Sequence, residues 1–220
     1  MTDARNAPVH LPRVIPEAPG RPVLDGSRSP IRKVTHQIAF EVGAWTRERA
    51  TNVAQLFNGM APEWSARHDP QHHAEPLVDA LDRGGPFPAR GRVCEVGSGT
   101  GLLTPLLDAR FATVVAVEIA EAMARLAPAN SGHRVLADGA ALPCADGAYD
   151  VVVLFNAFLF PAEVDRVLAP DGALVWVSAM GDDTPIYLPV GDVGAALPGA
   201  WSGVASEAGW GTWATFRRVR

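Results

Sequence analysis

The sequence predicts an α/β fold in which helices cover both faces of a mostly parallel sheet. Residues 92–111 read as a short apolar strand, a glycine-rich turn and a helix, in that order. The apolar run Thr113–Glu118 follows as a second strand. The run Tyr149–Phe155 is continuously apolar, which is typical of a central parallel strand that is covered on both sides.

The composition is that of one soluble globular domain. The chain has 220 residues, of which 48% are hydrophobic, enough for a sizeable core. A net charge of −5 argues against a broad surface for nucleic acid or an anionic membrane. The first residues contain no apolar run like that of a signal peptide, and the longest apolar stretch is too short to span a bilayer. We therefore expect a cytoplasmic protein; the pattern does not indicate its oligomeric state.

The two cysteines, Cys94 and Cys144, do not predict a disulfide framework, and a reducing compartment is the simpler interpretation. The glycine-rich turn beside Cys94 predicts a nucleotide site instead, because glycine allows the backbone to turn sharply and to approach a ligand closely. N–H groups at the start of the following helix would face the same space. Glu95 lies inside the strand, where a carboxylate is costly without a partner, so it is more typical of a site than of a core. A tight turn without a ligand is the alternative.

The spacing of the glycines separates two classes of nucleotide. A dinucleotide fingerprint requires G-x-G-x-x-G, but Leu102 stands at the place of its third glycine. The run from Glu95 through Gly97, Gly99 and Gly101 instead resembles the first motif of the class I S-adenosylmethionine-dependent methyltransferases. This resemblance implies a Rossmann-like, doubly wound sheet of seven strands with a reversed last strand. It also implies S-adenosylmethionine as the cofactor, with Ser98 and Thr100 of the same turn beside it.

Acids follow the next two strands. Glu118 ends the second strand, where a carboxylate can accept hydrogen bonds from both hydroxyls of a ribose, as in dehydrogenases and methyltransferases alike. Ile119 could lie flat against an adenine, and Met123 on the next helix is expected to face the same pocket. In the methyltransferase family an acid after the third strand, here Asp138, receives the adenine amino group.

The block of residues 135–160, VLADGAALPCADGAYDVVVLFNAFLF, resembles the family over its whole length. The resemblance implies that Gly139 and Ala140 lie beside the adenine, and that Phe155 and Asn156 face the transferred methyl group. Neither the Asn/Asp-Pro-Pro-aromatic motif of amino-methylating nucleic-acid and glutamine enzymes nor the acid of magnesium-dependent catechol enzymes is found here.

Before this core we predict two further parts. Residues 1–30 contain six prolines and no hydrophobic periodicity, which favours an extended or disordered arm. Residues 31–89 are expected to form a helical cover over a cofactor-binding core at 90–220. Thr46 is a possible N-cap of a cover helix that Pro62 ends or restarts.

The stretch FNGMAPEW, which ends at Trp64, resembles a family helix that lies over the cofactor. By that resemblance Trp64 walls the pocket and Arg67 pairs with the cofactor carboxylate. The alternative is an ordinary amphipathic helix with Trp64 as a packing anchor.

Three histidines, His68, His72 and His73, form a cluster. Only His68 and His72 share a helix face, and no pattern supplies a third ligand, so we expect no metal site. His68 is a weak candidate for a catalytic base, since histidine titrates near neutral pH. A solvated helix start is the simpler interpretation, and the catalytic residue stays unknown.

Three hypotheses for the function follow. The first is methyl transfer to an O, N or C atom of a small molecule; in-line displacement on an already activated cofactor requires positioning and no fixed base. The second is a cofactor-binding protein of the same fold without methyl transfer. The third, a nicotinamide oxidoreductase, is disfavoured by Leu102 and Asp138.

Overall fold

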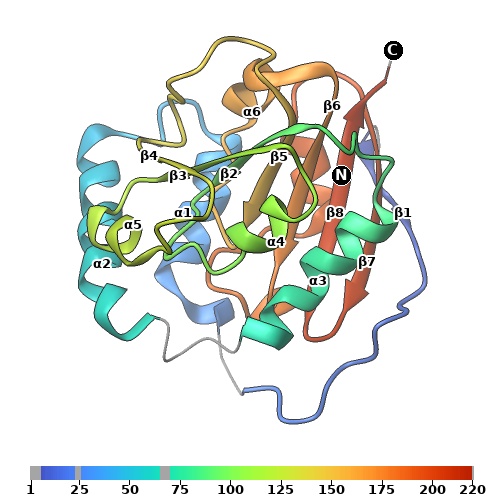
Figure 1. Cartoon of the computed structure of the whole chain (residues 1–220), viewed down its shortest axis with the longest axis horizontal. Helices are drawn as coiled ribbons and strands as arrows, with labels where there is room; N and C mark the ends of the chain where they lie inside the picture. The colour runs from blue at the N-terminus through green and yellow to red at the C-terminus, as the bar shows by residue number, and fades with distance from the viewer. Residues whose placement is uncertain (1–5, 23–25, 65–69, 220) are drawn as a thin grey trace.

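The computed structural model describes residues 6–22, 26–64 and 70–219 (Figure 1). One sheet of eight strands lies at its centre, in the order β1-β7-β8-β6-β5-β2-β3-β4. The strands are β1 (Val9–His10), β2 (Arg92–Val96), β3 (Thr113–Glu118), β4 (His133–Leu136), β5 (Tyr149–Phe155), β6 (Leu168–Ser178), β7 (Trp201–Ala208) and β8 (Gly211–Arg218). The helices are α1 (Pro30–Phe40), α2 (Arg47–Trp64), α3 (Pro70–Arg83), α4 (Thr104–Asp108), α5 (Glu121–Leu126), α6 (Pro161–Val167) and α7 (Val190–Ala196).

The direction of the strands confirms the predicted Rossmann-like sheet. Strands β2 to β6 pair in parallel, and β8 runs antiparallel to both of its neighbours, β6 and β7. The predicted count of seven strands was one too low. The extra strand is β1, in which Val9 and His10 pair in parallel with Val204 and Ala205. This short pairing is made by main-chain groups, so it leaves no hydrophobic pattern in the sequence.

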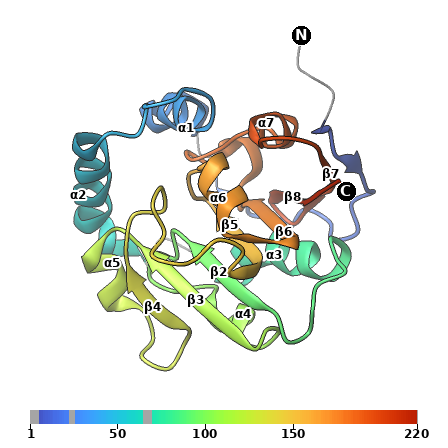
Figure 2. The same ribbon diagram turned by 90° about the horizontal axis from the view of Figure 1, so that it is seen from above.

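Helices cover the two faces of the sheet as expected (Figure 2). Helices α3 and α4 pack on one face, and α1, α6 and α7 pack on the other. Strand β5 shows why its sequence is continuously apolar: Val151 and Val153 face the α3 side, while Val152 and Leu154 face the α6 side, and all four are buried.

Helix α2, the cover helix, begins after its predicted N-cap but does not end at the proline that was expected to end it. Thr46 is its N-cap, because the Thr46 hydroxyl accepts a 3.1 Å hydrogen bond from the N–H of Arg49. Pro62 was expected to end this helix or start the next, but it lies inside α2, which continues to Trp64. Pro62 removes one main-chain hydrogen bond from the last turn of α2, and the buried Ala61 nevertheless holds this turn against α5.

One other boundary differs from the predicted one: the helix expected up to residue 111 is only the short α4, with Pro105 in its first turn. In the cover, α1 ends at Phe40. Strand β6 begins at Leu168, because Leu168 already pairs with Tyr149 before an irregularity in the ladder.

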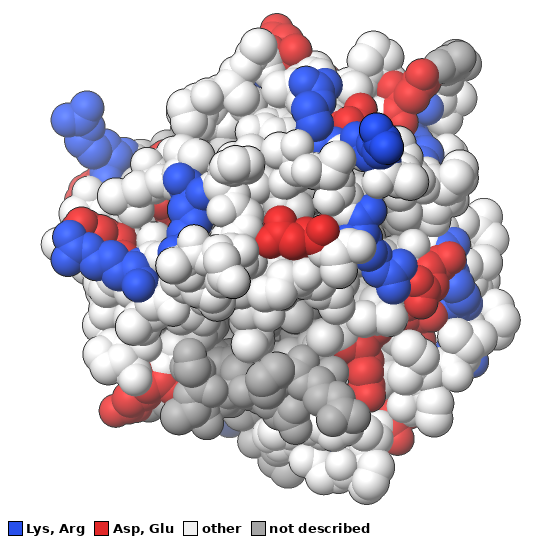
Figure 3. Space-filling model, in the orientation of Figure 1, with Lys and Arg blue, Asp and Glu red and all other residues white. Residues whose placement is uncertain are grey.

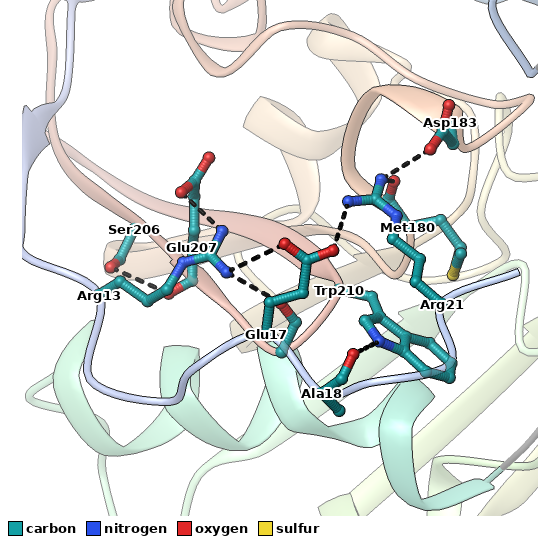
Figure 4. A network of polar contacts seen from close by, with 10 residues as sticks. Arg13, Glu17, Ala18, Arg21, Met180, Asp183, Ser206, Glu207 and Trp210 are labelled. Atoms are coloured by element: carbon teal, nitrogen blue, oxygen red, sulfur yellow. Dashed lines mark hydrogen bonds and ion pairs between the residues drawn. The ribbon is translucent and has the colours of Figure 1, made fainter. Parts of the chain in front are cut away.

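The N-terminal arm, residues 6–22, runs along the β7 edge and past the turn between β7 and β8 (Figure 4). The N–H of Leu11 donates to the carbonyl of Ala205 at 2.8 Å. Two arginines fix the arm to the body of the protein. Arg13 donates to the Glu207 carboxylate at 2.7 Å, and Arg21 donates to the Met180 carbonyl and to Asp183 at 2.8 Å each. From the body of the protein, Trp210 Nε1 donates to the Ala18 carbonyl of the arm at 2.8 Å. The arm therefore covers part of an edge strand that would otherwise present unpaired main-chain groups.

Acidic and basic side chains are interspersed on the face shown in Figure 3, often next to one another. Among the described residues, no helix combines the length and apolarity that crossing a membrane requires.

Candidate functional site

The glycine-rich turn after β2 lies where the parallel strands end. Gly97, Gly99 and Gly101 have φ angles of 73°, 57° and 69°, a region that side chains rarely adopt. A Cβ on Gly97 would lie 2.9 Å from the Cβ of Ala157, and one on Gly101 equally close to the Cβ of Ala127. A Cβ on Gly99 would meet open space except for an atom 4.0 Å away. Gly97 and Gly101 thus serve packing, whereas Gly99 leaves room for a ligand.

The main-chain donors of this turn are mostly used within the protein. The N–H groups of Gly97 and Ser98 donate to the Val117 carbonyl at 2.9 and 3.0 Å, and that of Gly101 donates to the Ser98 carbonyl. These three main-chain N–H groups therefore already have acceptors within the protein. The first half of the turn is instead an accessible stretch of backbone that a ligand can approach closely. Gly97, Ser98 and Gly99 are exposed or partly exposed, while Thr100 and Gly101 are buried.

Glu118 at the end of β3 is joined to this turn. Its Oε2 accepts from the N–H of Gly99 at 2.8 Å and its Oε1 from the N–H of Ala120 at 2.7 Å. Burial raises the pKa of Glu118, and the main-chain donors oppose that shift. A carboxylate has about four acceptor positions, so ribose hydroxyls can still be accommodated.

Glu95 has the partner that its place in a strand requires. Its Oε2 accepts a 2.6 Å hydrogen bond from the Thr104 hydroxyl, and only 3% of the residue is exposed. Burial raises the pKa of Glu95 to about 7, and the bond from Thr104 partly opposes this. Glu95 therefore lies beneath the glycine turn, against α4.

The segment after β4 is partly exposed at Asp138, Gly139 and Ala140. The N–H of Ala140 donates to Oδ1 of Asp138 at 2.9 Å. A Cβ on Gly139 would lie 2.8 Å from Val96 and 3.2 Å from the Phe160 ring, so only glycine fits there. Asp138 thus lies on an accessible rim with a fixed backbone.

Two predicted adenine neighbours lie beyond β3. Ile119 is partly exposed and follows Glu118 directly. Met123 is 1% exposed and packs with Ala61 and Ala120 between α2 and α5. The side chain of Met123 therefore supports the cover from within.

The end of β5 lies beside the glycine turn. Phe155 and Asn156 are partly exposed, and Asn156 has a φ of 49°, which is uncommon for a residue with a side chain. Its Oδ1 accepts from the N–H of Ala179 at 2.8 Å, which holds the ends of β5 and β6 together. Ala157 meets Gly97, so this end lies beside the glycine turn.

The cover contributes Trp64, whose Nε1 is the atom 4.0 Å from a Cβ built on Gly99. The Trp64 ring also packs edge-on against Phe57, with centroids 5.8 Å apart. The Trp64 indole thus lies near Gly99 of the glycine turn, and its role as a wall of the pocket stays a prediction. Arg67 and His68 lie outside the described residues.

The other two histidines lie at the β7–β8 turn. The His72 ring is 4.5 Å from the Trp210 ring and 3.3 Å from the Glu75 carboxylate, and the His73 ring lies 6.4 Å from that of Trp210. Within residues 6–22, 26–64 and 70–219, no group of three or more His, Cys, Asp or Glu is arranged to hold a metal ion.

Sequence reasoning missed three residues of this region. Trp45 donates to Asp138, Thr104 donates to Glu95, and Ala157 packs on Gly97. Each of these contacts joins different parts of the chain, and no periodicity marks them.

Comparison with known proteins agrees with this geometry. Residues 94–176 match the family model described as a methyltransferase domain. Two curated relatives, the malonyl-[acyl-carrier protein] O-methyltransferases of Geobacter sulfurreducens and Methylococcus capsulatus, are each 36% identical over 124 residues. The match covers 50% of this chain in both cases, and 45% and 44% of the two relatives, so the chain spans less than half of the length of each.

Solved structures show the same fold. The alignment with the DhpI–S-adenosylhomocysteine complex structure covers 75% of this chain and 94% of the DhpI chain, with a TM-score of 0.60 and 20% identity. A SAM-dependent methyltransferase from Aquifex aeolicus covers 71% and 96%, with a TM-score of 0.57 and 17% identity. Residues 94–176 thus match a methyltransferase domain, and the fold of the chain is that of solved S-adenosylmethionine-dependent methyltransferases.

Proposed function

We propose that this protein binds S-adenosylmethionine at the glycine turn and transfers its methyl group to an O, N or C atom of a small molecule. The observation that carries this proposal is the state of the turn itself. Its N–H groups at Gly97, Ser98 and Gly99 already have protein acceptors. A dinucleotide places its pyrophosphate on such donors, whereas S-adenosylmethionine carries no phosphate and requires only close approach.

The residues around the turn fit the cofactor. Glu118 would accept from the ribose, Asp138 from the adenine amino group, and Ile119 would lie against the ring. Phe155 and Asn156 would face the reacting end, with Trp64 over the turn. The cofactor supplies a carbon that is already activated by a positively charged sulfur. The role of the protein is then to align the acceptor and to exclude water, which a helical cover such as α1 and α2 can do.

The acceptor that we would test first is a malonyl group on an acyl carrier protein. The two curated relatives are named for O-methylation of this compound. A carboxylate is deprotonated at neutral pH and can attack without a general base. That chemistry is compatible with a site in which Asn156, and no acid, lies at the end of β5.

Binding without methyl transfer is the second candidate. The [4+2]-cyclase SpnF shares the fold, with a TM-score of 0.51 and 18% identity, so the fold does not decide the chemistry.

Calorimetric titration with S-adenosylmethionine, and separately with NADPH, tests the proposal. We expect saturable binding of the former alone, and at least tenfold weaker binding after Glu118→Ala, from the loss of about two charge-assisted hydrogen bonds. Glu207→Ala, an acid at the far edge of the sheet, serves as the control and should bind normally. Release of S-adenosylhomocysteine on addition of malonyl-acyl carrier protein would support transfer. Binding of NADPH alone would overturn the proposal, and binding without turnover on any acceptor would favour the second candidate.

A further inference from the structure

Trp45 and Asp138 are joined by a hydrogen bond between the cover and the core. The indole Nε1 of Trp45 lies 3.0 Å from Oδ1 and 2.8 Å from Oδ2 of Asp138. Trp45 belongs to the loop between α1 and α2, and Asp138 follows β4. We propose that Trp45 is a positioning residue that orients the Asp138 carboxylate for a ligand with a 6-amino purine. This inference rests on the proposed function and adds to it a determinant of base selection.

The indole is held in place from the side of β5. Its ring lies 5.7 Å from that of Phe158 and 5.2 Å, edge-on, from that of Phe160. Phe158 is buried, and Phe160 also contacts the position of Gly139. Aromatic neighbours on this side restrict the indole to few orientations, so its N–H points at the carboxylate without a large entropic cost.

The carboxylate keeps room for an adenine. Trp45 shares one hydrogen between the two oxygens, and the N–H of Ala140 takes one position on Oδ1. Of the roughly four acceptor positions of a carboxylate, Oδ2 retains one. Asp138 is partly exposed, and we infer that this position faces the ligand. A purine 6-amino group can donate to it, whereas a 6-oxo group places an acceptor against an acceptor.

The same contact ties the cover to the site. Helix α2 begins two residues after Trp45 with its N-cap Thr46, and it ends at Trp64 over Gly99. Between these ends, Oδ1 of Asn58 accepts from the N–H of Ala122 on α5 at 2.8 Å. The cover is therefore joined to the core by the hydrogen bonds of Trp45 and Asn58, the first of which is made to the predicted adenine acid.

The test compares two probes that differ at the purine 6 position. Binding of S-adenosylhomocysteine and of S-inosylhomocysteine, which has a 6-oxo group, is measured by calorimetry on the full chain. We expect Trp45→Phe, which keeps an aromatic ring but lacks the N–H, to lower the ratio of the two affinities about tenfold, because a carboxylate that is no longer oriented would lose its one charge-assisted hydrogen bond from the 6-amino group. Trp201→Phe is the matched control, because it removes the 2.7 Å bond from Trp201 Nε1 to the Pro198 carbonyl away from the site.

A double-mutant cycle shows whether Trp45 acts through Asp138. Asp138→Ala should lower the same ratio, and Trp45→Phe added to it should have no further effect. An equal loss of affinity for both probes in Trp45→Phe would mean a purely structural role and would overturn the proposal. An affinity ratio equal to that of the wild type, or tighter binding of S-adenosylhomocysteine by Trp45→Phe, would also overturn the proposal. If the wild-type chain binds neither probe, the proposed function fails as well, whereas binding with an unchanged ratio removes only the role of Trp45.

Discussion

The hydroxyl of Thr104 donates a 2.6 Å hydrogen bond to Oε2 of Glu95 and so turns the acid of the glycine motif toward helix α4. The motif therefore contains two acids with separate tasks. Glu95 is nearly inaccessible and fixes the helix that follows the turn. Glu118 holds the turn itself and retains acceptor positions for a ligand.

Glu95→Gln should make the protein more stable at high pH relative to the wild type. Burial raises the pKa of Glu95 to about 7 in the folded state, from an ordinary value of 4.5. The folded chain thus binds this proton more tightly than the unfolded chain, and the stability due to it is lost as the pH rises through about 7. The shift corresponds to about 3 kcal/mol. Urea denaturation at several pH values between 5 and 8 should show the difference between variant and wild type growing with pH. Parallel stability curves would contradict it, and Glu207→Gln controls for loss of an exposed acid.

Gly99→Ala and Gly101→Ala should separate binding from stability. Both glycines have positive φ, which costs alanine about 1–2 kcal/mol. A Cβ on Gly101 also lies 2.9 Å from Ala127, so Gly101→Ala should lower the melting temperature more. A Cβ on Gly99 meets no close atom of the protein, so its main effect should be weaker binding of S-adenosylmethionine. Thermal melts and calorimetry on both variants test this. Normal binding by a folded Gly99→Ala variant would remove Gly99 from the site.

Asp79→Ala should destabilise the fold strongly without touching the site. Asp79 is 2% exposed and accepts from Trp213 Nε1 at 2.7 Å and from Arg83 Nε at 2.7 Å. The change leaves the buried Trp213 Nε1 without its acceptor, which costs about 1–3 kcal/mol, and leaves Arg83, whose side chain is 22% exposed, without its carboxylate. The control is Asp82→Ala on the same helix, since Asp82 forms an exposed pair with Arg110 that contributes about 0–1 kcal/mol. Similar unfolding free energies for the two variants would show that the buried pair contributes little.

Much of the fold was predictable because it depends on local patterns. The apolar runs of β3 and β5 have the predicted bounds, and Pro161 begins α6 as a proline at the first helical position should. The predictions were wrong where the structure depends on a contact between residues that are distant in the chain. Strand β1 exists because β7 offers an edge, and α2 passes Pro62 because α5 holds its last turn.

The candidate site shows the same division. The glycine turn and Glu118 could be expected to lie side by side from spacing, because both follow adjacent parallel strands, and their roles toward a cofactor stay predictions. The contact of Trp45 with Asp138 joins residues 93 positions apart, and the internal use of the N–H groups of the turn depends on the register of β2 against β3. Neither leaves a periodic signal.

Removal of residues 1–22 should weaken the fold and promote association of chains. The loss would include the pairing of β1 with β7 and the bonds of Asn6 to the carbonyls of Gly194 and Gly199. It would also leave Trp210 Nε1 without the Ala18 carbonyl. The exposed edge of β7 could then pair with another chain. Light scattering at increasing protein concentration should show a rising apparent mass for the truncated chain alone, and urea denaturation should show a lower midpoint. Arg125→Met, which breaks an exposed pair with Glu121, is the control for loss of a surface contact. A truncated chain with the wild-type midpoint and mass would show that the arm lies on the sheet without stabilising it.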